Sequence, residues 1–147
     1  MNAHRTGTAL ALALSIIASP AHAQTEPTPP ASGFDAGRVV GTALTASIGS
    51  YAGGYVGAIA ALPAIYSHNA PVVLGTIAFG TTLGAASGAT LINGDWESSM
   101  LGSLAGLGIG TLAAWMVYET TGPDSAPEVT FVITQGLVTA LVAELLR

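Results

Sequence analysis

The sequence contains few charged residues, no cysteine and no lysine. The absence of cysteine excludes disulfides, thiolate metal sites, a cysteine nucleophile and a lipid anchor on cysteine. The absence of lysine excludes a phosphate-binding P-loop. Charged residues make up 7% of the chain, whereas soluble domains have about 25%. So little charge cannot cover a surface that faces water.

The few charges are mostly negative, because three arginines stand against eight acidic residues and the net charge is -5. This balance excludes nucleic acid as a partner, since its binding requires many basic side chains. It also argues against an anchor on anionic lipid headgroups. Hydrophobic residues make up 50% of the chain, and the mean hydropathy is +0.61. These values predict that the lipid bilayer is the main partner of the surface.

The first 33 residues are predicted to lie outside the fold. Residues 1–23 have the pattern of a signal peptide: a short basic start at Arg5, an apolar run from Thr8 to Ile17, and the small-residue site Ala21-His22-Ala23. An uncleaved N-terminal anchor is the alternative. Residues 24–33 are rich in proline and form an extended linker. The domain is therefore expected over residues 34–147.

Four long apolar segments fill that domain and predict an all-α fold, a membrane-embedded bundle of four glycine-rich helices built as helical hairpins. The helices are expected at about 35–62, 72–92, 96–118 and 127–146. The first three segments are long enough to cross a bilayer, and the fourth is marginal. A β-barrel is the alternative for an exported chain, but the continuous apolar runs and the 6% aromatic content disfavour it.

Capping residues and helix breakers support these boundaries. Ser32-Gly33-Phe34-Asp35 and Ser125-Ala126-Pro127-Glu128 have the spacing of capping boxes at the first and fourth helix starts. Pro63 is expected to end or kink the first helix. Asn93-Gly94 is expected to close the second helix, and Asp95 to cap the third, which makes a tight helical hairpin.

Small residues recur at intervals of four in the first three helices. Positions four apart lie near one another on one side of a helix, so small residues there let two backbones approach closely. One such pair is weak evidence, because glycine is common in membrane helices, but three helices repeat it. The predicted packing residues are Gly41, Gly49, Gly53, Gly57, Gly80, Gly84, Gly88, Gly102, Gly106 and Gly110. Because a step of four drifts around a straight helix, one straight neighbour cannot follow the whole stripe. Either the helices cross in a right-handed sense, or the first helix touches two neighbours along its length, and the second alternative is favoured.

The stretches GSYAGGYVG, GTTLGAASG and GSLAGLGIG, followed by VITQGLVTALVAELLR, carry a resemblance to known proteins. The pattern resembles a broad class of uncharacterised, signal-peptide-bearing bacterial glycine-zipper membrane proteins. The resemblance implies a structural role in the bacterial cell envelope, with no catalytic residues. The better-known outer-membrane zipper lipoproteins have a cysteine anchor that this chain lacks, so both the inner and the outer membrane stay open as its location.

The sequence offers little for catalysis. It contains no G-x-S-x-G or H-E-x-x-H motif, and His68 stands alone in a loop. No catalytic, cofactor-binding or metal residue and no cofactor is predicted, and the chain is not expected to be an enzyme. Gln135 is expected to form interhelical hydrogen bonds, and Glu144 to pair with Arg147 one turn away. A proton path between Gln135 and Glu144 is the transport alternative.

These observations predict a non-enzymatic envelope protein with a structural or assembly role through tight helix packing. A second copy of the chain or another envelope protein is the expected protein partner. The alternative is an oligomeric pore or small transporter. A pore would line its centre with polar side chains, whereas a packing module would fill the centre with small apolar ones.

Overall fold

The fold was analysed in a computed structural model, which describes residues 33–122, 124 and 126–147. The predicted signal peptide and nearly all of the proline-rich linker lie outside the described residues. Residues Phe34–Arg147 form one compact unit. Its elements are helical, and no strand occurs in the described part of the chain, so the all-α prediction is confirmed. The helices are α2 (Ala36–Ala60), α3 (Leu62–Tyr66), α4 (Ala70–Asn93), α5 (Trp96–Thr121) and α6 (Pro127–Leu145).

Helix α2 begins one residue after Asp35, whose side chain accepts hydrogen bonds from the N–H groups of Gly37 and Arg38. Asp35 is therefore the capping residue itself, and not the fourth residue of a box headed by Ser32. At the other end, α2 stops at Ala60 and the chain restarts as the short helix α3. Pro63 lies in the first turn of α3, where its missing N–H group is tolerated.

The caps in the turn between α4 and α5 are the predicted ones, but the two helices do not form the predicted tight hairpin, since α4 pairs with α2 and α5 pairs with α6. Gly94 closes α4 in the left-handed conformation with φ 75°, which glycine adopts without a steric penalty. Asp95 caps α5 by accepting a hydrogen bond from the N–H of Glu97. The start of α6 differs from the prediction: its cap is Ala126, also in the left-handed region, and Ala126 makes no side-chain cap bond. Ser125, which headed the predicted box, lies outside the described residues.

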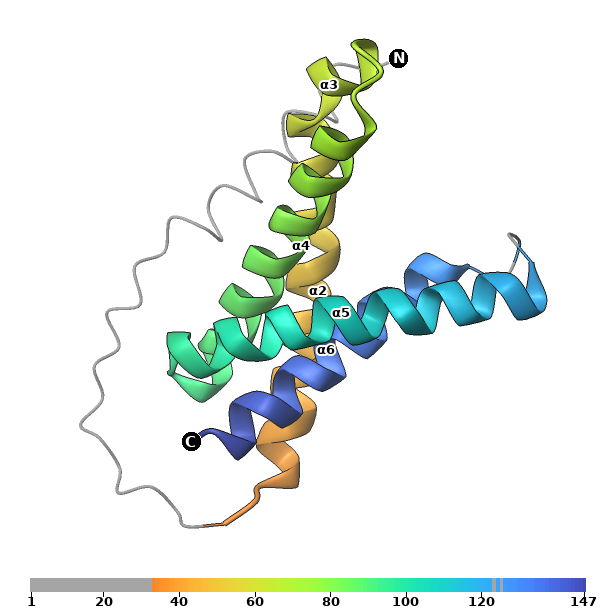
Figure 1. Ribbon diagram of the computed structural model, residues 1–147. Helices are drawn as coiled ribbons and strands as arrows, with labels where there is room; N and C mark the ends of the chain where they lie inside the picture. The colour runs from red at the N-terminus through yellow and green to blue at the C-terminus, as the bar shows by residue number, and fades with distance from the viewer. Residues whose placement is uncertain (1–32, 123, 125) are drawn as a thin grey trace, which may run out of the picture. The chain divides into compact units, whose positions relative to one another are not determined.

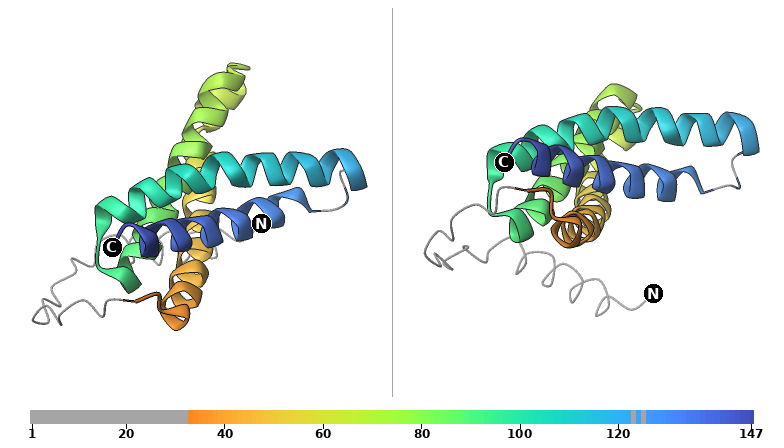
Figure 2. Two further views of the ribbon diagram at one scale, coloured as in Figure 1. Left: turned by 60° about the horizontal axis from the view of Figure 1, so that its bottom comes forward. Right: turned by 90° about the horizontal axis from the view of Figure 1, so that it is seen from below.

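The helices pair as two antiparallel hairpins. Helix α2 packs along α4, and α5 packs along α6 (Figure 1). The second hairpin runs across the first, with α6 against α2, as the additional views also show (Figure 2). The start of α2, the α4–α5 turn and the end of α6 lie together, and from there the two hairpins diverge. The three most extensive interfaces between helices are α2 with α4, α5 with α6, and α2 with α6, and α4 also contacts α5 and α6.

The interior is built from small residues. The buried apolar side chains are almost all alanines, with Val39 the exception, and the largest fully buried side chain is Gln135. The large apolar residues lie outside: Ile48 is 69% exposed, Phe79 63% and Leu112 61%. A soluble domain would bury such residues, because removing their apolar surface from water is the main driving force of folding.

Three helices among the described residues are long and apolar enough to cross a membrane, namely α4, α5 and α6. This set differs from the expectation drawn from segment length. Helix α6, whose segment was expected to be marginal, is long and apolar enough with 19 residues. Helix α2 has the expected length, with 25 residues, but is not among the three. Its many glycine, serine and threonine residues lower its hydropathy while they serve close contacts with α4 and α6.

Candidate functional site

The interface between α2 and α4 is a contact between two backbones. A Cβ atom added to Gly49 would lie less than 3.0 Å from the carbonyl oxygen of Gly84, and one added to Gly84 would meet the carbonyl of Gly49 in the same way. Gly53 and Gly80 repeat this reciprocal contact one turn further along. A distance below 3.0 Å to a backbone atom leaves no room for a side chain, so only glycine fits at these four positions.

The same register continues at both ends of this interface. Gly57 lies against the carbonyl of Thr76, at 2.6 Å from a Cβ added to the glycine, and Gly88 lies against the carbonyl of Thr45. Each step of four residues forward along α2 is matched by a step of four back along α4. The small residues that recur at intervals of four in α2 therefore lie against those that recur at the same interval in α4.

Helices α5 and α6 form a second interface in which the glycines come from one side only. A Cβ added to Gly102 would lie 2.6 Å from the carbonyl oxygen of Thr139, and one added to Gly106 would lie 2.6 Å from that of Gln135. At Gly110 the nearest atom is the carbonyl oxygen of Phe131, at 3.0 Å. The contact therefore loosens towards the end of α5.

The third interface, between α2 and α6, depends on a glycine that the sequence did not single out as a packing residue. A Cβ added to Gly136 would overlap the hydroxyl of Ser47 and lie 2.7 Å from the carbonyl of Ala43. Gly136 is isolated in α6, without glycines four residues away, so no repeat marks it. Conversely, Gly41 belongs to the predicted stripe but has ordinary contact with Ile92, at 3.7 Å. The structure therefore does not place Gly41 at a close approach between backbones.

Helix α2 has two neighbours, as expected, although its glycine stripe does not divide between them. Gly49, Gly53 and Gly57 all face α4, and Gly41 faces Ile92 of the same helix. The contact with α6 uses the neighbouring face, which includes Ala43 and Ser47. The two neighbours expected for this helix are therefore present, but the glycines at close contact use only one of them, α4.

Gln135 lies where α2, α5 and α6 meet. Its side chain is fully buried, accepts a hydrogen bond from the hydroxyl of Ser50 at 2.5 Å, and donates one to the backbone carbonyl of Ser103 at 3.4 Å. The predicted interhelical hydrogen bonding of Gln135 is thus confirmed. A buried amide needs such partners, since an unpaired polar group in an apolar interior is unfavourable. The two bonds join both hairpins at one residue.

An ion pair joins α2 and α6 near the chain end. The guanidinium of Arg38 donates two hydrogen bonds to Glu144, at 2.7 Å to Oε2 and 2.5 Å to Oε1, and the side chain of Glu144 is only 5% exposed. Glu144 also accepts the backbone N–H of Asp35 at 3.1 Å. The predicted pairing of Glu144 with Arg147 is therefore wrong. Arg38 lies across the helix interface and binds the carboxylate with two parallel hydrogen bonds. Such a pair is stronger than a contact with the exposed side chain of Arg147 would be.

The α4–α5 turn contains a small buried polar cluster. The side-chain oxygen of Asn93 accepts hydrogen bonds from the Ser99 hydroxyl and the Asp95 backbone, whereas its buried Nδ2 atom has no hydrogen-bond partner. A hydrogen bond from the Ser98 side chain, together with the backbone N–H groups of Glu97 and Ser98, holds the pKa of Asp95 below its usual value, against the opposing effect of burial. The cluster fixes the sharp turn between the hairpins.

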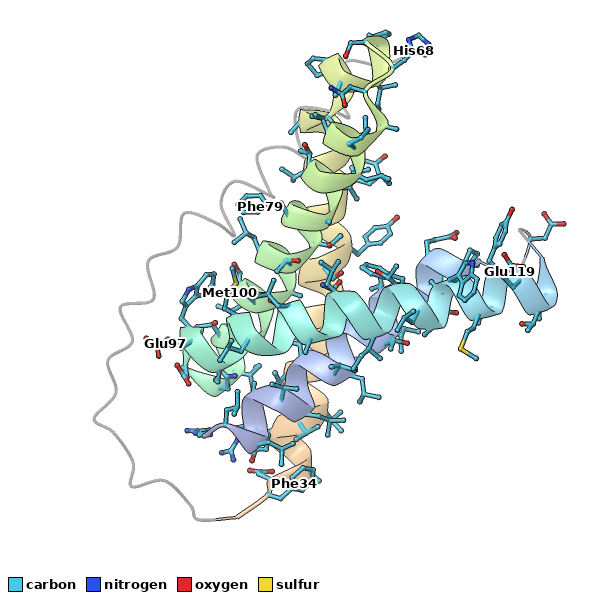
Figure 3. All side chains as sticks on the ribbon, viewed as in Figure 1. Phe34, His68, Phe79, Glu97, Met100 and Glu119 are labelled. Carbon is cyan, nitrogen blue, oxygen red and sulfur yellow. The ribbon has the colours of Figure 1, made fainter. Side chains whose placement is uncertain are left out.

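Groups able to perform chemistry are scattered over the described residues. Figure 3 shows His68 at the tip beyond α3, Glu97 at the start of α5, and Glu119 near the opposite end of that helix. No set of three His, Asp or Glu side chains that could hold a metal ion occurs in the described part of the chain. The arrangement therefore concentrates its specific contacts at the helix interfaces.

Comparisons with protein-family models, with curated proteins and with solved structures find no match to this chain. The resemblance to glycine-zipper membrane proteins therefore stays a prediction that rests on the quoted stretches. The distinctive features of the described residues are the helix interfaces and the apolar surface that they leave exposed.

Proposed function

We propose that the chain is a non-enzymatic, membrane-embedded helical module of the bacterial cell envelope, with a structural or assembly role that depends on glycine-mediated helix packing. The observation that carries this proposal is the distribution of side-chain size, which is the reverse of that in a soluble protein: small side chains lie inside and large apolar ones outside. Glycine, alanine, serine and threonine fill the interfaces, while leucine, isoleucine, valine and aromatic residues point outward. Membrane helices associate in this way, because lipid tails are as apolar as leucine and close backbone packing drives the contact.

The length and composition of the helices support the same proposal. Helices α4, α5 and α6 can each cross a hydrocarbon core, and α2 packs against two of them. Between Arg38 and Asp95 the chain carries no charge, so the α2–α4 hairpin presents an uncharged surface along most of its length. In this proposal Trp96, Trp115 and Tyr118 are interfacial anchors, and they are 45%, 59% and 48% exposed.

The polar interior favours packing over conduction. The buried amide of Gln135 is occupied by Ser50 and Ser103, and the hydroxyl of Thr139 bonds the backbone of its own helix. Side chains whose hydrogen bonds are directed at one another hold helices together and do not present free groups to a passing ion. The alternative, a pore, would require several copies that enclose a polar path between them.

The proposal is tested by expressing a tagged chain, separating membranes from the soluble fraction, and extracting the membranes with detergent. Recovery in the membrane fraction after a carbonate wash is expected, because the exposed apolar surface requires lipid. Crosslinking of the extracted protein then identifies whether its partner is a second copy or another envelope protein. Recovery of folded protein in the soluble fraction would contradict the proposal. Ion flux through liposomes containing the purified chain would favour the pore.

A further inference from the structure

The diverging hairpins leave an open groove between α2 and α6. The groove has a volume of about 370 Å³ and is lined almost wholly by apolar atoms. Its apolar walls are Ile48, Tyr51 and Ala52 of α2 and Val129, Val132 and Ile133 of α6. None of the three interfaces described above fills it, because Gly136 brings α2 and α6 together further along α6.

One acidic residue distinguishes this groove from the rest of the apolar surface. Glu128, in the first turn of α6, lines the groove with its aliphatic part, since almost no polar surface faces the groove, and its carboxylate beside the groove forms no ion pair within the part of the chain that the structure describes. The other charges at this end of the α5–α6 hairpin, Glu119 and Asp124, are also acidic. The sequence has no basic residue between Arg38 and Arg147 that could neutralise them.

We propose that this groove binds the acyl chain of a zwitterionic phospholipid whose ammonium headgroup pairs with Glu128. This inference rests on the proposed membrane location. The apolar walls suit a hydrocarbon chain, and the negative charge at the groove suits a cation. A carboxylate attracts an ammonium group, and the ring of Tyr51, which also lines the groove, offers a second favourable surface to it. An anionic headgroup would meet three carboxylates and no base.

The position of Glu128 agrees with the way a lipid lies in a bilayer. It stands at the start of α6, next to the α5–α6 connection, whereas Val132 and Ile133 lie a turn deeper in the same helix. A headgroup at the membrane interface would thus reach the carboxylate, while the chain follows the groove towards the middle of the helices. Glu119 belongs to the same hairpin end but does not line the groove, which makes it a matched control.

The test uses the full chain purified in detergent and mixed with equal amounts of phosphatidylethanolamine and phosphatidylglycerol that carry the same acyl chains. Native mass spectrometry counts the lipid that stays bound. We expect the ethanolamine lipid to be retained about two- to fivefold better, which is the range for one partly exposed ion pair. Glu128→Gln is expected to abolish this preference, and Glu119→Gln to keep it.

A second pair of variants tests the groove itself. Ala52→Trp fills it and is expected to lower retention of both lipids, whereas Val40→Trp, on an exposed part of α2 outside the groove, is not. Equal retention of the two lipids by the unmodified chain, or the same loss in both glutamate variants, would overturn the proposal. A dimer that Ala52→Trp converts to a monomer would also overturn it, since a second copy would then be the occupant. These outcomes can be told apart from failure of the proposed membrane location. In that case the protein would be recovered in the soluble fraction during membrane fractionation, before any lipid is tested.

Discussion

The hydroxyl of Ser50 in α2 donates a hydrogen bond to the side-chain oxygen of Gln135 in α6, with an oxygen–oxygen distance of 2.5 Å. Both residues are completely buried. The two positions are 85 residues apart in the sequence and belong to different hairpins. Because the amide of Gln135 also reaches the backbone of Ser103, this one contact fixes how α2, α5 and α6 meet.

The first prediction concerns this contact. Ser50→Ala removes the hydroxyl and leaves the oxygen of Gln135 buried without its donor, so the free energy of unfolding should fall by about 0.5–2 kcal/mol. Unfolding in mixed detergent micelles, followed by circular dichroism, measures the change. Ser87→Ala is the matched control, since Ser87 is exposed and its hydroxyl bonds only its own helix. An equal loss in both variants would show that the Ser50–Gln135 bond contributes nothing specific.

The second prediction separates glycines that pack from glycines that do not. Gly84→Ala places a methyl group against the backbone of Gly49, so the hairpin has to open and the protein should lose about 1–3 kcal/mol of stability. Gly75→Ala adds the same group where nothing lies within 4 Å. It should raise stability by about 0.5–1 kcal/mol, because alanine is the better helix former. Detergent unfolding compares the two variants, and the same sign for both would contradict the packing argument.

A larger substitution should affect assembly as well as stability. Leucine at Gly84 or at Gly106 cannot be accommodated, because the neighbouring atoms are backbone carbonyls that cannot move aside alone. We expect Gly84→Leu to separate α2 from α4, and Gly106→Leu to separate α5 from α6. Size-exclusion chromatography and thermal unfolding in detergent should both change. Gly108→Leu, at an exposed glycine in α5 with nothing within 4 Å of an added Cβ, should leave both measurements unchanged. Unchanged elution and unfolding for all three leucine variants would contradict the packing argument.

The Arg38–Glu144 ion pair gives a fourth, independent prediction. Glu144→Gln keeps the shape of the side chain but removes the charge that faces the guanidinium, so the midpoint of thermal unfolding should fall. Exchanging the two residues, as Arg38→Glu with Glu144→Arg, should restore part of the loss. Glu97→Gln, at an exposed position, is the control. A midpoint that drops equally in the exchanged double variant and in Glu144→Gln would show that the pairing itself does not matter.

The sequence was sufficient for the helical elements and much of the packing register. The intervals of four in α2, α4 and α5 predicted which glycines would lie at interfaces, because a helical repeat is a local property. The pairing of Gly49 with Gly84 needs only a hairpin in the right register. The turn at Gly94 and Asp95 was predictable for the same reason, since capping depends on neighbours within a few residues.

The contacts between hairpins could not be predicted in this way. Arg38 and Glu144 are 106 residues apart, whereas Arg147 lies one turn from Glu144, so local spacing favoured the wrong partner. Gly136 also carries no repeat, so its contact with Ser47 depends entirely on how α6 crosses α2. Gly41 shows the converse: it is in the right register, but the side chain of Ile92 lies opposite it in place of a small residue.

The last prediction concerns the exposed apolar surface. The chain has no cysteine, so single cysteines can be introduced without a background. Leu112→Cys lies on the exposed side of α5, and Ser67→Cys lies at the end of α3, in the turn before α4. In intact membrane vesicles a membrane-impermeant maleimide should label Ser67→Cys from one side only and leave Leu112→Cys unlabelled, because thiolate forms poorly in hydrocarbon. Both should react after denaturation in detergent. Rapid labelling of Leu112→Cys in intact vesicles would mean that water, and not lipid, covers the exposed apolar surface. The placement of small side chains inside and large apolar ones outside would then need another explanation.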